Sequence, residues 1–96
     1  MEIAEFQKRI EEIYYDRDSR RGLEKTFMWL VEEIGELSRA LRRCDRTSVE
    51  AEFADVLAWL NTVASIAGVD LEEAAARQYA DGCPKCRGTP CQCPDS

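Results

Sequence analysis

The sequence predicts an all-α fold in one small domain. Apolar residues recur every three or four positions through most of the chain, and strand-like alternation of useful length is absent. All three prolines lie in the final 13 residues, so the first 80 residues contain none. Ninety-six residues suffice for one domain, but a domain of this size buries only part of its surface. We therefore expect a four-helix protomer that assembles into a dimeric or tetrameric bundle.

The first expected helix spans residues 2–15, and a polar loop over residues 16–22 follows it. Its apolar residues are Ile3, Phe6, Ile10, Ile13 and Tyr14. The second expected helix spans residues 23–43 and has one continuous apolar face. That face consists of Leu23, Phe27, Leu30, Val31, Ile34, Leu37 and Leu41. A short link over residues 44–46 then lets the next helix run antiparallel to it.

The third expected helix begins near Thr47, because Thr47 and Glu50 have the spacing of a capping box. It runs to about Ala67 and is ended by Gly68. Residues 56–69 contain no charge, so this helix is apolar nearly all round. We expect a further helix or subunit to cover its second side.

The fourth expected helix is short and opens with Asp70 and Glu73, which offer similar capping chemistry. It ends around Ala80, before a segment rich in glycine, proline and cysteine. The predicted organisation is therefore a helical domain over residues 1–80 and a cysteine-rich tail over residues 81–96.

Composition excludes several classes of function. The chain contains no histidine, which removes Ser-His-Asp and Cys-His nucleophilic mechanisms and His-ligated zinc. Thirteen basic and 19 acidic residues give a net charge of −6, which argues against nucleic-acid and anionic-membrane partners. No window approaches the roughly 20 apolar residues of a membrane span, and the N-terminus lacks the apolar core of a signal peptide. We expect a cytoplasmic protein.

Two acidic pairs occupy matching positions on the second and third expected helices. Glu33 and Glu36 form the first pair, and Glu52 and Asp55 form the second, each flanking an apolar packing face on the same side. In an antiparallel hairpin the pairs converge, because each lies roughly ten residues from the turn. Each pair alone also has the spacing of an ordinary solvated helix edge. Neighbouring Trp29 and other apolar residues on the acidic side favour a shared pocket instead.

Four converging carboxylates need a counter-ion. Two unit charges about 4 Å apart repel by on the order of 4 kcal/mol at an effective dielectric near 20. An all-carboxylate site favours a hard divalent cation, Mg²⁺ or Mn²⁺, with phosphates of a substrate as further ligands. Without these four acids the chain would have 13 basic and 15 acidic residues, a balance of −2. Most of the excess negative charge therefore belongs to this group.

The motifs Leu-Val-Glu-Glu-Ile-Gly-Glu-Leu and Glu-Phe-Ala-Asp-Val-Leu resemble those of the all-α nucleotide pyrophosphohydrolases of the MazG type. The similarity covers roughly residues 20–80. It implies Mg²⁺-dependent hydrolysis of a nucleoside triphosphate to the monophosphate and pyrophosphate. It also implies that Mg²⁺ is bound by Glu33, Glu36, Glu52 and Asp55. Glu32 matches the first acid of the motif, with a role in the second shell of the metal or in orienting water.

A triphosphate substrate also needs cations and a surface for its base. The candidate cations are Arg17, Arg20, Arg21 and Lys25, for which a solvated charged surface is the alternative. Trp29 and Trp59 each stand one helical turn from a candidate ligand, where they either stack on a base or are buried at a subunit contact. Many members of the family carry a lysine near the end of the last helix, and here Arg77 takes its place as a candidate phosphate contact.

The tail contains four cysteines in the pattern C-x2-C-x4-C-x-C. Cys83, Cys86, Cys91 and Cys93 predict an all-thiolate zinc site resembling a zinc knuckle. Two disulfides, free thiols and an unmetallated disordered tail are the alternatives. Cys44 stands apart, and without a histidine to act as base a packing role is favoured over a nucleophilic one.

Two hypotheses about function follow. The first is a nucleotide pyrophosphohydrolase that acts on NTPs or dNTPs as a homodimer or homotetramer, with phosphoribosyl-ATP as a lesser variant of substrate. The second is a non-enzymatic scaffold or regulator that keeps the helical bundle and uses the cysteine tail to bind a partner.

Overall fold

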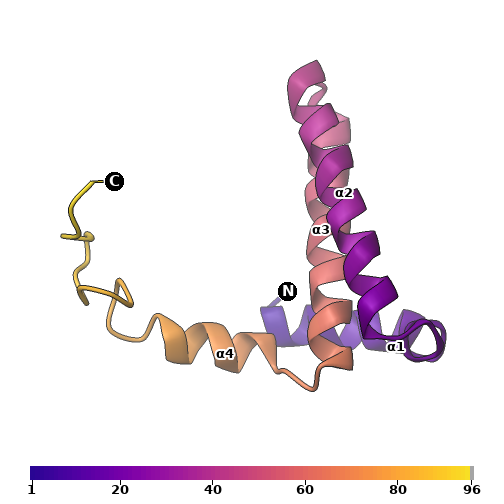
Figure 1. Cartoon of the computed structure of the whole chain (residues 1–96), viewed down its shortest axis with the longest axis horizontal. Helices are drawn as coiled ribbons and strands as arrows, with labels where there is room; N and C mark the ends of the chain where they lie inside the picture. Colours follow the sequence, from indigo (N-terminus) through magenta and orange to yellow (C-terminus); the bar gives the residue numbers. More distant parts are fainter. Residues whose placement is uncertain (96) are drawn as a thin grey trace.

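The computed structural model describes residues 1–95 of the chain (Figure 1). It contains four helices and no strand in that range, which confirms the all-α prediction. The helices are α1 (Ile3–Arg21), α2 (Leu23–Arg43), α3 (Arg46–Ile66) and α4 (Leu71–Gln78). The long helices α2 and α3 form an antiparallel hairpin, and α1 crosses the end of the hairpin that lies away from the α2–α3 turn. The tail beyond α4 extends away from the hairpin (Figure 1).

The polar loop predicted over residues 16–22 is wrong, because α1 stays helical to Arg21. One ion pair of this segment lies inside the fold: buried Asp18 accepts a hydrogen bond from Arg21 at 2.9 Å, across an i, i+3 spacing. Asp16, Arg17 and Arg20 are exposed on the continued helix. The chain turns only at Gly22, whose φ of 88° favours glycine. This extension places the cationic end of α1 beside the hairpin.

The turn between α2 and α3 is tighter than predicted. Cys44 adopts the left-handed conformation, with φ 56°, and Asp45 is the N-cap of α3. The predicted capping box of Thr47 and Glu50 is therefore wrong: the helix begins one residue before Thr47, and Glu50 pairs with Arg46 at 3.0 Å. The carboxylate of Asp45 accepts a hydrogen bond from the Ser48 hydroxyl and not from the backbone.

A buried glutamine ties α1 to the junction between α3 and α4. The Gln7 amide donates to the hydroxyl of Ser65 at 3.0 Å and to the carbonyl of Val69 at 2.8 Å. Its carbonyl accepts a hydrogen bond from the backbone N–H of Leu71 at 3.0 Å. Both the amide nitrogen and the carbonyl oxygen of this side chain are therefore used in holding α1, α3 and the start of α4 together.

The predicted cap of the last helix is confirmed. Asp70 is the N-cap of α4, and its carboxylate accepts a hydrogen bond from the backbone N–H of Glu73 at 3.0 Å. The preceding helix ends at Ile66, and Gly68 takes a positive φ of 76° in the connection, as its predicted role as a helix stop requires.

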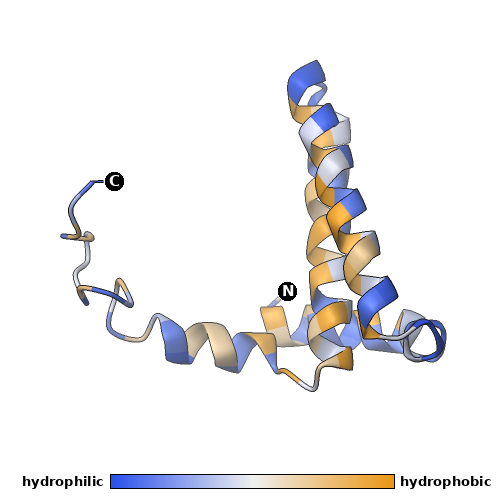
Figure 2. Ribbon diagram, viewed as in Figure 1, coloured by the Kyte–Doolittle hydropathy of each residue, from blue (hydrophilic) through white to orange (hydrophobic). Residues whose placement is uncertain are grey.

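The protomer leaves a large apolar surface uncovered, which we call the outer apolar face. Buried apolar residues are few in the described chain: Ile10, Leu30, Ala40 and Ala64. The outer apolar face comprises residues of α2 and α3 that are each between 42% and 54% exposed: Phe27, Val31, Ile34, Leu41, Phe53, Leu57 and Leu60. Apolar residues follow both long helices in Figure 2. An isolated monomer rarely exposes so many large apolar side chains together.

No single helix among residues 1–95 has the length and apolar character needed to cross a membrane. The helices α3 and α4 meet that criterion only as a pair, across a bend of 96°.

Candidate active site

The α2–α3 hairpin brings three of the predicted carboxylate ligands together. Glu33 and Glu36 come from α2, and Glu52 comes from α3; one carboxylate oxygen of each lies within 4.8 Å of the others. The antiparallel pairing explains this convergence, since the two acidic pairs lie at comparable distances from the turn at Cys44. We call these three residues the acidic triad.

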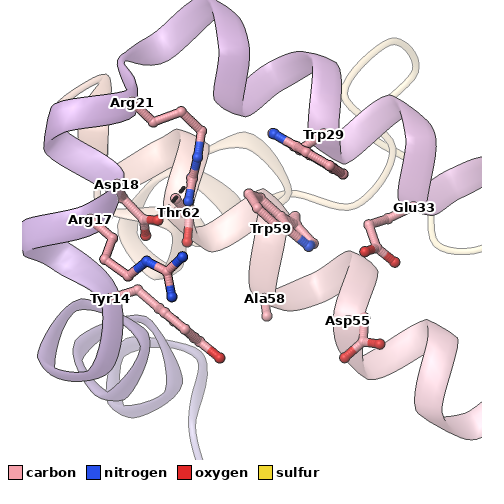
Figure 3. Close-up of a pocket in the computed structure, with 10 residues that line it drawn as sticks. All are labelled: Tyr14, Arg17, Asp18, Arg21, Trp29, Glu33, Asp55, Ala58, Trp59 and Thr62. Carbon is pink, nitrogen blue, oxygen red and sulfur yellow. Dashed lines mark hydrogen bonds and ion pairs between the residues drawn. The ribbon is translucent and has the colours of Figure 1, made fainter.

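Asp55, the fourth predicted ligand, lies one helical turn after Glu52 on α3. Figure 3 shows its carboxylate near that of Glu33, at the same end of a pocket. Its negative charge contributes to the pKa of Glu33, which places it in the same electrostatic group as the triad. Glu32 is exposed and is not among the residues that line this pocket.

The acidic triad carries unbalanced negative charge. Burial, followed by the charge of Glu36 and then of Asp55 and Glu52, raises the pKa of Glu33 from 4.5 to about 7. One oxygen each of Glu33 and Glu52 is buried and accepts no hydrogen bond from any group in residues 1–95. Buried carboxylate oxygens without donors are costly unless a cation meets them. The arrangement therefore fits a hard divalent ion.

A pocket of about 410 Å³ adjoins the acidic triad. Its walls come from the C-terminal half of α1, the first part of α2 and the middle of α3 (Figure 3). The lining residues are Tyr14, Arg17, Asp18, Arg21, Trp29, Glu33, Asp55, Ala58, Trp59 and Thr62. Figure 3 shows Glu33 and Asp55 at one end, Arg17 and Arg21 with Asp18 at the other, and two indoles between them.

The two tryptophans form the aromatic part of the wall. The rings of Trp29 and Trp59 are stacked, with centroids 6.1 Å apart and an interplanar angle of 17°. The guanidinium carbon of Arg21 lies 5.0 Å from the ring centroid of Trp59, a cation–π distance. The same guanidinium also pairs with buried Asp18, so its position is held from two sides. Trp29 is still 47% exposed and is therefore accessible to a ligand.

The structure separates the predicted cations into two groups. Because α1 remains helical, Arg17 and Arg21 lie one turn apart on the same face, and both line the pocket. Arg20 and Lys25 are exposed and do not line it. Arg77 lies on α4, where it pairs with Glu73.

Four pocket residues, Tyr14, Asp18, Ala58 and Thr62, were not predicted as part of a site. Tyr14 is counted among the apolar residues of the first expected helix, and Asp18 falls in the expected loop. The available signal was the i, i+3 spacing of Asp18 and Arg21 directly before Gly22, which is typical of a helix that continues to a glycine stop.

The cysteines form a second cluster, far from the acidic triad in the fold (Figure 1). The sulfur atoms of Cys83, Cys86, Cys91 and Cys93 all lie within 4.8 Å of one another. Cys44 is exposed at the C-terminus of α2, outside this cluster.

Fold and site together define an all-α protein in which a helical hairpin gathers carboxylates beside an aromatic and cationic pocket. A family model, the MazG nucleotide pyrophosphohydrolase domain, matches residues 21–81. The match covers well over half of the chain, and the protein belongs to the MazG nucleotide pyrophosphohydrolase family. The matched segment spans α2, α3 and α4 and agrees with the resemblance over residues 20–80. No curated protein matches the chain.

Proposed function

We propose that the protein hydrolyses nucleoside triphosphates, NTP or dNTP, to the monophosphate and pyrophosphate by attack of water on the α-phosphate. The family is one of nucleotide pyrophosphohydrolases, which supports the class of reaction. The observation that carries the proposal for this chain is the acidic triad with its unpartnered buried oxygens next to a pocket of nucleotide-binding character.

The proposed metal is Mg²⁺, with Mn²⁺ as the alternative. Its ligands would be Glu33, Glu36, Glu52 and Asp55, an all-oxygen set suited to a hard cation. When bound, such an ion neutralises phosphate charge and activates water. The carboxylates themselves must be ionised to bind it, and the raised pKa of Glu33 means that this residue gives up its proton near neutral pH. Glu32, exposed on α2 directly before Glu33, would orient water or act in the second shell.

The pocket would bind the nucleotide beside the metal. The indoles of Trp29 and Trp59 offer flat surfaces on which a base can stack. Arg17 and Arg21 place positive charge on the wall at the opposite end from Asp55, and this charge favours an anionic ligand (Figure 3). Exposed Arg20 and Lys25 add positive charge close by along the chain.

The protein would act as a homodimer or homotetramer. In both helices of the hairpin the outer apolar face repeats an i, i+4, i+7 pattern: Phe27, Val31 and Ile34 in α2, and Phe53, Leu57 and Leu60 in α3. Because the helices are antiparallel, helical geometry places both stripes on the same side, opposite the acidic triad. A second copy of the chain would bury this face and complete a bundle. Nucleic acid and membrane are not among the proposed partners, and the proposed location is cytoplasmic.

Pyrophosphate release from a panel of dNTPs and NTPs, with and without Mg²⁺, tests the proposal. We expect metal-dependent turnover of at least one nucleotide, and loss of that turnover in the double variant Glu33→Gln, Asp55→Asn. The matched control is Glu50→Gln on α3, whose exposed side chain pairs with Arg46 outside the site. Absence of turnover across the whole panel with metal present, or full activity of the double variant, would show that the proposal is wrong.

A further inference from the structure

The tail holds four thiols in an ordered arrangement that the nucleotide site does not use. Cys83 Sγ lies 3.7 Å from Cys93 Sγ and 3.6 Å from Cys91 Sγ, and Cys86 Sγ lies 3.9 Å from Cys91 Sγ. Four ligands at a Zn–S distance of about 2.3 Å in a tetrahedron are about 3.8 Å apart along each edge. The measured separations agree with that geometry. A disulfide requires about 2.05 Å, and all four cysteines are free.

Backbone N–H groups donate hydrogen bonds to the cysteine sulfur atoms, as they do around thiolate ligands of a metal ion. The N–H groups of Gly88 and Gln92 donate to Cys86 Sγ at 3.4 and 3.2 Å, and the N–H of Cys93 donates to Cys91 Sγ at 3.3 Å. Such N–H donors stabilise the negative charge of four thiolates around one divalent ion. Exposed Lys85 and Arg87 lie next to the ligands in sequence and add compensating positive charge.

The first half of the cluster is a tight turn in which glycines are required. The N–H of Cys83 donates to Gly88 O at 3.0 Å, and the N–H of Arg87 donates to Cys83 O at 2.6 Å. A side chain at Gly82 would collide with Thr89 Oγ1, and one at Gly88 would come within 2.7 Å of Pro90 O. This close backbone approach lets the two halves of the pattern face each other.

The tail has no apolar core that could hold this turn. Residues 81–95 contain no Leu, Ile, Val, Met or aromatic residue, and most of them are exposed. Segments this short need disulfides or a metal to fix one conformation. With all four thiols free, a metal ion bound by them would supply this stability.

We propose that Cys83, Cys86, Cys91 and Cys93 bind one Zn²⁺ ion through four thiolates and that this ion folds the tail. Soft thiolate ligands in a tetrahedron select zinc, whereas the all-carboxylate triad selects a hard ion. The tail site is separate from the pocket in the fold, so the two metal sites bind independently of each other (Figure 1). The inference therefore does not rest on the proposed hydrolysis.

Metal analysis of the full chain, purified in reductant without chelator, tests the proposal. We expect about one zinc per chain in the wild type and near zero in the variant Cys83→Ser, Cys86→Ser. Cys44→Ser is the matched control, because it removes an exposed cysteine outside the cluster and keeps the zinc. Equal zinc in the wild type and the double variant would overturn the proposal. So would a wild type that contains iron, or one that lacks metal and cannot bind added Zn²⁺.

Two further measurements keep the test decisive if the double variant misfolds. Cobalt added to the zinc-free wild type should give the visible absorption of tetrahedral Co²⁺–thiolate coordination, which zinc then displaces. Trypsin should cleave after Lys85 and Arg87 faster once a strong chelator removes the ion, while far-UV circular dichroism of the helices stays unchanged. Identical cleavage with and without zinc would show that the ion does not fold the tail.

Discussion

The acidic triad and the cysteine cluster are two candidate metal sites that differ in what holds their ligands in place. The triad collects ligands about 20 residues apart, from Glu33 to Glu52, and two 21-residue helices hold them in place. The cysteine cluster spans only Cys83 to Cys93 and has no core beneath it. The helices therefore position the triad without an ion, at the cost of charge repulsion, whereas we expect the tail to depend on its proposed Zn²⁺ for its shape.

The largest expected effect follows from removing one ligand of the triad. Glu52→Gln should lower kcat/KM for the best nucleotide by about 10² to 10³-fold, because the proposed Mg²⁺ site loses a carboxylate ligand that has a buried, unpartnered oxygen. Zinc content should stay at the wild-type level. Steady-state kinetics and metal analysis of the same preparation check both points, with Glu50→Gln as the control. Parallel loss of activity and zinc would contradict the independence of the two sites.

The second expected effect is stabilisation of the hairpin by Mg²⁺. An ion that binds only the folded state at 100 times its Kd adds about 2.7 kcal/mol to the free energy of unfolding. Unfolding monitored by the fluorescence of Trp29 and Trp59, which lie in α2 and α3, should therefore shift to higher temperature with added Mg²⁺. Removal of zinc from the tail should leave this transition unchanged. A shift of equal size in the variant Glu33→Gln, Asp55→Asn would contradict the assigned ligands.

The third expected effect concerns pH in the absence of metal. Burial and the neighbouring carboxylates raise the pKa of Glu33 in the folded protein to about 7, against 4.5 for the unfolded chain. Between these values the folded state holds a proton that the unfolded state has released, so this contribution to stability is complete below 4.5 and lost as pH rises through about 7. The full shift in the pKa of Glu33 corresponds to about 3 kcal/mol in the free energy of unfolding. Because the carboxyl is partly exposed, solvent screening reduces this contribution to about 1 to 2 kcal/mol.

Chemical denaturation of the metal-free protein between about pH 5 and about pH 8 measures this effect. The wild type should lose stability across that range, and Glu33→Gln should show a flatter profile because it has no proton to release. Saturating Mg²⁺ should oppose the loss at the high end, where Glu33 is ionised and able to bind it. A wild-type profile that does not fall with rising pH would contradict the raised pKa of Glu33.

The sequence was sufficient to predict the parts of this molecule that depend on periodicity. Apolar spacing predicted the hairpin and placed both acidic pairs on the same side of their helices, and the structure brings Glu33, Glu36 and Glu52 together. The spacing of four cysteines likewise predicted a cluster, because all of its members lie within eleven residues. In both cases local geometry determines which side chains can meet.

Charged residues that pair inside the fold were harder to predict. Asp16 to Arg21 have the composition of a solvated loop, yet Asp18 is buried against Arg21 and the helix continues. Arg21 in this extension contacts Trp59 of α3 and the Thr26 hydroxyl of α2, and helical propensity does not report such tertiary contacts. The same extension places Asp18 in the pocket wall, one helical turn after Tyr14. Apart from Arg21, this part of α1 also lies outside the segment matched by the family model.

The smallest expected effect is the change in KM on replacing Arg77, compared with that on replacing Arg17. The sequence predicted both arginines as candidate phosphate contacts. Arg17 lines the pocket, whereas Arg77 pairs with Glu73 on an exposed face of α4. Exposed ion pairs of this kind contribute about 0 to 1 kcal/mol, so Arg77→Ala should change stability by less than about 1 kcal/mol and KM by less than about threefold. Arg17→Ala removes a charge from the pocket wall and should raise KM by about tenfold, the equivalent of about 1.4 kcal/mol of substrate binding.

Kinetics of the two alanine variants on the same nucleotide give this comparison, and thermal melts of both show that the protein remains folded. If Arg77→Ala raised KM as much as Arg17→Ala does, then Arg77 would contact substrate after all. Since α4 does not line the pocket of its own protomer, that contact would have to come from the neighbouring copy in the assembly. The smallest predicted effect is therefore also a test of whether each nucleotide site is completed within one chain.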